Sequence, residues 1–265
     1  MTEGHRSGEP KEWNAAAYHV LSDPQFAWGR RVLERVALRG DEQVLDAGCG
    51  SGRLTRELAS RITTGFVVAC DLSENMTRKA RETLGDVAPH SMVCANLTAL
   101  PFRDAFDLVF STATFHWIRD HDLLFRELRG ALREGGRLEA QCGGGPNLAD
   151  IHARANALRE QDPFRRYFVG WNDPWLFATP AETDTRLQRA GFAKSHCWME
   201  RAPTPFPAAD RFRAFIQSVV MRPYLLPLPD DLQARFLDAI VSEAANDDPP
   251  FTLDYWRLNI SAIAN

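Results

Sequence analysis

The chain has 265 residues, of which 45% are hydrophobic and 25% charged, as in an ordinary globular protein with one large domain or one domain and a lid. Its formal net charge of −4 argues against a nucleic-acid partner, and no apolar stretch is long enough to cross a membrane. Five scattered cysteines form no Cys-x-x-Cys pair, so we expect reduced thiols, a cytoplasmic location and no metal site.

Residues 13–145 alternate between short apolar runs and helical patterns. Asp23 and Pro24 are predicted to cap and start a first helix that ends near residue 38. Further helices are predicted between five strands, which are expected at 43–46, 65–70, 91–95, 106–110 and 137–142. Strands that alternate with helices form parallel βαβ units, so this segment predicts a doubly wound sheet.

The pattern changes after Pro146, where two helical and aromatic-rich inserts interrupt the core. Strands at 194–200 and 255–263 are expected to return the chain to the sheet. The sequence therefore predicts an α/β protein with a Rossmann-like, doubly wound, mostly parallel seven-stranded sheet and a helical lid. In chain order, the predicted parts are a disordered tail (1–12), the core (13–145), a first lid insert (146–178), more core (179–206), a second lid insert (207–250) and a final core strand (251–265).

The most informative segment is residues 44–52, which read Val-Leu-Asp-Ala-Gly-Cys-Gly-Ser-Gly. An apolar strand ends here in Asp46 and opens into three glycines at alternate positions, which allow positive φ angles and a close ligand. A helix is expected to begin near Arg53 with its free N–H groups facing the same place. The pattern predicts a cradle for a nucleoside-type ligand at the carboxyl end of the first strand.

The spacing of these glycines resembles the first motif of the class I S-adenosylmethionine-dependent methyltransferases. A dinucleotide fingerprint needs Gly-x-Gly-x-x-Gly, but the sixth position from Gly48 is Arg53. The resemblance extends along the core through four more segments, which are Asp71 after the second strand, Asn96-Leu97 with Leu100-Pro101-Phe102, 106–111, and 132–138.

This resemblance implies a site for S-adenosylmethionine, and S-adenosylhomocysteine as the product. Asp46 would offer a negative charge to the amino and sulfonium groups, and Asp71 would accept both ribose hydroxyls. Asn96 stands where the family usually has an Asp that accepts from the adenine amino group, and its carbonyl oxygen can also accept. The cofactor-binding residues implied are Tyr18, Asp46, Gly48, Cys49, Gly50, Gly52, Asp71, Leu72, Met76, Asn96, Leu97 and Ser111.

Three other segments are similar to the trans-aconitate methyltransferase-like group, whose general layout the juvenile-hormone-acid methyltransferases share. They are Trp13-Asn14 with Tyr18, Phe115-His116-Trp117, and 221–225. Both groups methylate carboxylates on small molecules. The resemblance implies transfer of a methyl group by in-line displacement to a small-molecule acceptor, most readily to the oxygen of a carboxylate or hydroxyl. It leaves the acceptor, the pathway and the oligomeric state open.

His116 is the candidate catalytic residue, because it follows a core strand at the edge where ligands bind in such sheets. It could act as a base or pack with Trp117 as a pocket wall, and a carboxylate acceptor would need no base. Arg222 could clamp an acceptor carboxylate or form a surface salt bridge, and His152 is expected on a helix surface. The candidate substrate-binding residues, which favour a partly apolar acceptor, are Trp117, Tyr167, Trp171, Arg222 and Tyr224.

Other functions are weighed against this one. The fold also suits a protein that binds S-adenosylmethionine without methylating, or a cyclase, because displacement chemistry needs no particular acid or base. A nicotinamide-dependent oxidoreductase is disfavoured by the missing third glycine and by the lack of a Tyr-x-x-x-Lys set. A protein or RNA methyltransferase is disfavoured by the apolar lid and by the absence of a basic surface.

Overall fold

The computed structural model describes residues 15, 22–87 and 90–265. Its main sheet has seven strands in the order β3-β2-β1-β4-β5-β9-β6. Strands β1 to β5 run parallel, and β9 is antiparallel to both of its neighbours, β5 and β6. The predicted α/β fold with a mostly parallel seven-stranded sheet is therefore confirmed. The strands are β1 (Gln43–Ala47), β2 (Phe66–Asp71), β3 (His90–Cys94), β4 (Phe106–Thr112), β5 (Leu132–Gly143), β6 (Phe192–Arg201) and β9 (Trp256–Ala264).

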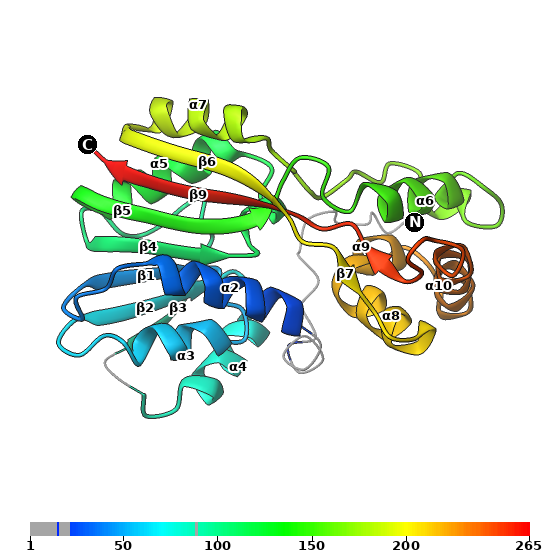
Figure 1. The fold of residues 1–265 in the computed structure, drawn as a ribbon, viewed down its shortest axis with the longest axis horizontal. Helices are drawn as coiled ribbons and strands as arrows, with labels where there is room; N and C mark the ends of the chain where they lie inside the picture. The colour runs from blue at the N-terminus through cyan, green and yellow to red at the C-terminus, as the bar shows by residue number, and fades with distance from the viewer. Residues whose placement is uncertain (1–14, 16–21, 88–89) are drawn as a thin grey trace, which may run out of the picture.

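Helices cover both faces of this sheet (Figure 1). Apolar side chains line both faces of the central strands, as a parallel sheet between two helical layers requires; Leu45, Leu108 and Val109 are fully buried. The covering helices are α2 (Asp23–Arg35), α3 (Arg53–Ala59), α4 (Glu74–Leu84), α5 (His121–Ala131) and α7 (Pro180–Ala190). The capping box of α7 is present, because the Thr179 hydroxyl accepts from the Glu182 N–H while the Glu182 carboxylate accepts from the Thr179 N–H.

Most strand ends lie within one or two residues of the sequence prediction, and the clearer differences are at α2 and β5. Helix α2 has Ser22, not Asp23, at its N-cap position, and it ends at Arg35. Strand β5 begins at Leu132, because the predicted turn at Gly135 is an irregularity within the strand, where the register opposite β4 shifts. A positive φ of 73° at Gly135 accommodates this irregularity.

A helical part, comprising residues 146–178 and 207–250, lies beyond the carboxyl ends of β4 and β5 (Figure 1). Its aromatic and aliphatic side chains form one continuous core around Tyr224 and Phe236. It contains α6 (Ala149–Arg159), η2 (Arg165–Tyr167), α8 (Ala209–Phe215), η3 (Ile216–Val220), α9 (Arg222–Leu225) and α10 (Asp230–Ala244), and the two-stranded sheet of β7 (Thr204–Pro205) and β8 (Thr252–Leu253) adjoins it. None of the helices described in the structure combines the length and apolarity needed to span a bilayer.

Candidate active site

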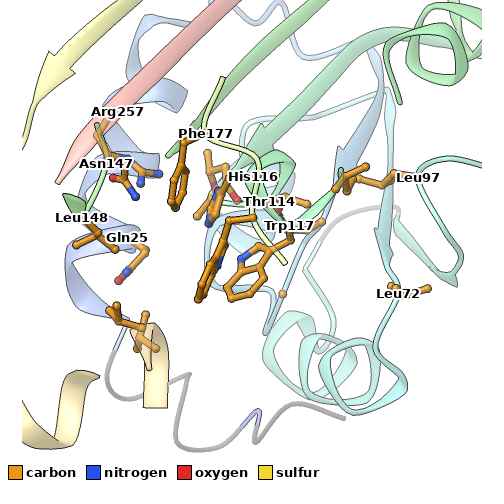
Figure 2. A pocket seen from close by; sticks show the side chains of 18 of the residues that line it. Gln25, Leu72, Leu97, Thr114, His116, Trp117, Asn147, Leu148, Phe177 and Arg257 are labelled. Atoms are coloured by element: carbon orange, nitrogen blue, oxygen red, sulfur yellow. Dashed lines mark hydrogen bonds between the residues drawn. The ribbon is translucent and has the colours of Figure 1, made fainter. Parts of the chain in front are cut away.

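A large cavity, the main cavity, lies between the sheet and the helical part. It holds about 1200 Å³ of empty space, part of which is open to solvent. Its walls come from the glycine-rich loop after β1, the segment after β4 and the helical part (Figure 2). A second, smaller cavity of about 450 Å³ borders the other side of the same loop. Both lie at the carboxyl ends of parallel strands, where ligands bind in open α/β sheets.

Backbone hydrogen bonds attach the glycine-rich loop to the end of β2. The N–H groups of Gly48 and Cys49 both donate to the carbonyl of Cys70, at 2.8 and 2.9 Å. Gly48 has a φ of +86°, and a Cβ there would lie 2.1 Å from the Thr114 hydroxyl oxygen. Gly52 allows close helix packing instead, because a Cβ there would lie 2.9 Å from Ala80 on α4. Gly48 shapes the cavity, whereas Gly52 allows α3 to start against α4.

Asp71 is fixed at the end of β2 by two backbone donors. Its Oδ2 accepts from the Gly50 N–H and its Oδ1 from the Ser73 N–H, both at 2.9 Å. A carboxylate oxygen can accept more than one hydrogen bond, so these two contacts are compatible with a ligand hydroxyl. Next to it, Leu72 is 53% exposed although it lines the main cavity. A carboxylate beside an apolar shelf suits a ribose that carries a flat base.

Asp46 borders the smaller cavity and is buried. The Thr55 hydroxyl donates to its Oδ2 at 2.7 Å. Burial raises the pKa of this carboxyl group to about 7, and the nearby charge of Asp71 adds to the rise. A cationic group placed beside Asp46 would favour its ionised form.

His116 lines the main cavity with its ring between Trp117 and Phe177, at centroid distances of 5.5 and 5.9 Å. Its Nδ1 accepts from the backbone N–H of Gly143 at 3.3 Å. Burial, followed by the positive charge of Arg257, holds the pKa of His116 well below its usual value. The imidazole is therefore neutral, and because Nδ1 is the acceptor, Nε2 carries the proton. His116 is arranged to donate a hydrogen bond, not to remove a proton.

Comparisons with known proteins agree with this geometry. A family model described as a methyltransferase domain matches residues 45–156. Trans-aconitate 2-methyltransferase of Deinococcus radiodurans is 30% identical over 85% of this chain and 87% of its own length. The chain belongs to the class I S-adenosylmethionine-dependent methyltransferases. The resemblance drawn from the sequence motifs is thereby confirmed.

One further curated relative and one solved structure are similar to this methyltransferase. Trans-aconitate 2-methyltransferase of Variovorax paradoxus is 29% identical over 85% of this chain and 86% of its own length. The solved phosphoethanolamine N-methyltransferase 2 of Haemonchus contortus, in complex with S-adenosylhomocysteine, superposes with a TM-score of 0.60. It is 19% identical and the match covers 95% of this chain and 56% of that one, so it shows the shared fold.

S-adenosylmethionine is the cofactor of this methyltransferase, and the residues present fit it. The loop at Gly48 has no room for a side chain and leaves space for a close ligand. We expect Asp71 to hold the ribose and Leu72, Met76 and Leu97, which line the same cavity, to contact the adenine. Gly50 borders both cavities, whereas Asp46 and Cys49 border the smaller one, where we expect the amino-acid end. No trio of His, Cys, Asp or Glu suited to a metal ion occurs in the part of the chain that the structure describes.

Asn96 is oriented differently from the sequence expectation. Its Oδ1 already accepts from the N–H and the hydroxyl of Thr98, at 3.0 and 2.9 Å. This turn leaves the amide N–H₂ as the group that Asn96 can offer to the cavity that it lines. We therefore expect Asn96 to donate to a ring nitrogen of adenine, instead of accepting from its amino group.

Several candidate residues do not line either cavity. Tyr224 is fully buried inside the helical part, where its hydroxyl donates to Asn156, and Trp171 stacks on it at 4.9 Å. Tyr167 and Arg222 also lie outside the cavity linings. The Ser111 hydroxyl donates to the Ala47 carbonyl at 2.6 Å, a hydrogen bond that joins β4 to β1. Tyr18 falls outside the described residues, as does the predicted tail.

Other lining residues were missed from the sequence. His152, expected on a helix surface, lines the main cavity and packs against Trp175 at 4.5 Å; burial lowers its pKa to about 4. Gln25, Asn147 and Arg257 line the same region. The sequence carried one sign of such a residue, Arg257 within the apolar pattern of the last strand. That sign alone does not tell which cavity the side chain lines.

Asp46 gives a prediction about stability. Its pKa is higher in the folded chain than in the unfolded one, so the folded chain binds more protons between about pH 4 and pH 7. Ionisation of Asp46 therefore destabilises the free protein as pH rises through this window. Asp46→Asn is expected to raise the free energy of unfolding at pH 8 by up to about 4 kcal/mol, at 1.36 kcal/mol per pKa unit, as measured by urea denaturation.

The pH dependence separates this effect from a general gain in packing. The advantage of Asp46→Asn should grow from pH 5 to pH 7 and stay constant above. Asp107 is the matched control, because hydrogen bonds from Gln43 and Arg133 hold its pKa below the usual value, and Asp107→Asn should lose stability at pH 8. If Asp46→Asn raises the free energy of unfolding equally at pH 5 and pH 8, ionisation of Asp46 is not the cause.

Proposed function

We propose that this methyltransferase esterifies a carboxylate on a small molecule. The observation that carries the proposal is the hydrogen bond from the Gly143 N–H to His116 Nδ1, which leaves His116 as a donor. A carboxylate is ionised at pH 7 and needs no base, unlike a phenol or an ammonium group. The curated relatives named trans-aconitate 2-methyltransferase, by their names, act on a small carboxylic acid.

Each part of the site has a role in this reaction. Bound S-adenosylmethionine supplies a methyl group already activated by a positively charged sulfur. The glycine-rich loop and Asp71 orient that methyl group, while His116 Nε2–H holds one carboxylate oxygen so that the other attacks in line. Such positioning can supply about 7–11 kcal/mol of the barrier. We also propose that the helical part acts as a lid, because Trp175 and Val220 line the main cavity from it and exclude water.

The proposal is tested by following a deuterated methyl group. The protein is incubated with S-adenosylmethionine labelled in the methyl group and with panels of small carboxylic acids, phenols and amines. We expect mass spectrometry to show label in carboxylic acids, as methyl esters that mild base hydrolyses. Label in phenols or amines alone would contradict the proposal, and label in no acceptor would favour a binder or cyclase on this fold.

The role of His116 gives a sharper prediction. His116→Phe keeps a flat ring but removes the donor, so kcat/KM should fall about 10- to 100-fold, the effect of one hydrogen bond to a charged group. His116→Gln can place an N–H near the position of Nε2 and should retain activity within about 10-fold of the parent. A glutamine variant as inactive as the phenylalanine variant would indicate a base. With S-adenosylmethionine kept saturating, kcat of the parent should be flat from pH 6.5 to 8.5, because the imidazole stays neutral.

A further inference from the structure

We propose that Arg257 binds a second anionic group of the acceptor, so that the preferred substrates are small dicarboxylic acids; this inference rests on the proposed function. Arg257 lies at the start of β9 and is 3% exposed, yet it lines the main cavity. Among the described lining residues it is the only arginine or lysine. A guanidinium at that place can bind a carboxylate through two parallel hydrogen bonds.

The register of the sheet places Arg257 beside His116. Residue 257 on β9 pairs with Gly143 on β5, and Gly143 is the residue whose N–H holds His116. Figure 2 shows Arg257, Asn147 and Gln25 at one end of the cavity, Leu72 and Leu97 at the other, and His116 between them. An acceptor can therefore reach Arg257 with one end while its other end lies at His116.

Two contacts within the described structure orient the Arg257 side chain. Its guanidinium lies over the ring of Trp28 at 4.7 Å, and its Nε donates to Gln141 Oε1 at 3.5 Å. Gln141 is in turn fixed by a hydrogen bond from its Nε2 to Asn259 Oδ1, at 2.8 Å. Stacking and side-chain anchoring reduce the freedom of a long side chain, so less entropy is lost when it binds an anion.

A second observation marks this end of the cavity as a polar ligand site. Gln25 is 9% exposed, and its Oε1 is buried with no hydrogen-bond partner in the described structure, while its Nε2 donates to the Tyr255 hydroxyl at 3.4 Å. Buried polar atoms are seldom left unpaired. Because Gln25 Oε1 can only accept, an acceptor molecule that also carries a hydroxyl or N–H group would pair it at the end of the cavity where Arg257 lies (Figure 2).

The test compares matched acids in two assays. Succinate, glutarate and adipate are paired with butyrate, pentanoate and hexanoate, first as methyl acceptors and then as ligands of the protein saturated with S-adenosylhomocysteine. The parent should prefer the dicarboxylate of at least one pair by about 10- to 100-fold, the effect of hydrogen bonds to a charged group. Arg257→Gln should reduce this preference below about 3-fold, and Arg257→Lys, which keeps the charge, should retain part of it.

Arg201→Gln is the matched control, since Arg201 also lies over a tryptophan ring, that of Trp256, but does not line the cavity. It should keep the preference, and all variants should bind S-adenosylhomocysteine as the parent does, which shows that they fold. A preference that survives in Arg257→Gln, or a parent that prefers the monocarboxylates, overturns the inference. Methyl transfer without dependence on Arg257 refutes the inference but keeps the proposed function. Binding of dicarboxylates that depends on Arg257, without methyl transfer, keeps the inference but refutes the proposed function. If the protein shows no binding and no methyl transfer, both are refuted.

Discussion

Replacement of Gly48 by alanine is expected to abolish binding of S-adenosylmethionine. The new Cβ would lie 2.1 Å from the Thr114 hydroxyl oxygen and 2.6 Å from the Thr114 Cβ, at a backbone φ of +86°. The left-handed conformation alone costs about 1–2 kcal/mol for a non-glycine residue. The collision must also move either the loop or the segment after β4, and both line the cavity. Calorimetric titration should show at least a 100-fold weaker affinity, or none.

The matched control for this variant is Gly135→Ala. Gly135 also has a positive φ, +73°, but a Cβ there would meet nothing within 4 Å. The control should therefore lose about 1–2 kcal/mol of stability from backbone strain and retain its affinity. If both variants bind S-adenosylmethionine equally well, the close approach at Gly48 does not matter for binding.

Asp71→Ala is the second variant with a large expected effect. The carboxylate arranges the backbone N–H groups of Gly50 and Ser73, and we expect it to accept from both ribose hydroxyls. Hydrogen bonds to a charged group contribute about 1.5–3 kcal/mol each. Two of them correspond to an affinity loss of at least about 100-fold for S-adenosylmethionine and for S-adenosylhomocysteine.

Asp107→Ala controls for the loss of an aspartate on another strand of the same sheet. Asp107 also accepts from a backbone N–H, that of Gln43 at 2.8 Å, and pairs with Arg133. It lines neither cavity. The control should lose stability without losing affinity for either adenosyl ligand. An Asp71→Ala variant with the affinity of this control would show that Asp71 only supports the loop.

The order of strands and helices could be predicted because its signals are local. A buried parallel strand reads as a short apolar run, and helix ends are marked by residues such as Thr179 and Gly191, where the structure has a capping box and a left-handed terminus. The glycine-rich loop was recognisable for the same reason. Its glycines stand at alternate positions in the sequence, although the contacts that they allow, with Cys70, Ala80 and Thr114, are distant along the chain.

The acceptor end of the cavity was less predictable because it is assembled over long distances in sequence. Gln25 and Tyr255 are 230 residues apart and share a hydrogen bond. In the helical part, Tyr224 and Trp175 are both aromatic residues next to a proline in an apolar segment, so they look alike in sequence. One is fully buried and the other faces the cavity. Contacts with residues distant in the sequence, such as that of the Tyr224 hydroxyl with Asn156, distinguish them.

The buried carboxyl group of Asp46 also couples cofactor binding to protons. Near or below its raised pKa of about 7, part of the free protein carries a proton on this group. A cationic ligand beside the carboxylate favours the ionised form, so each binding event would release up to one proton in this pH range. The heat of binding should then change with the ionisation enthalpy of the buffer, and the affinity should decline as the medium becomes acidic. Acidification would thus lower occupancy by S-adenosylmethionine at a fixed concentration.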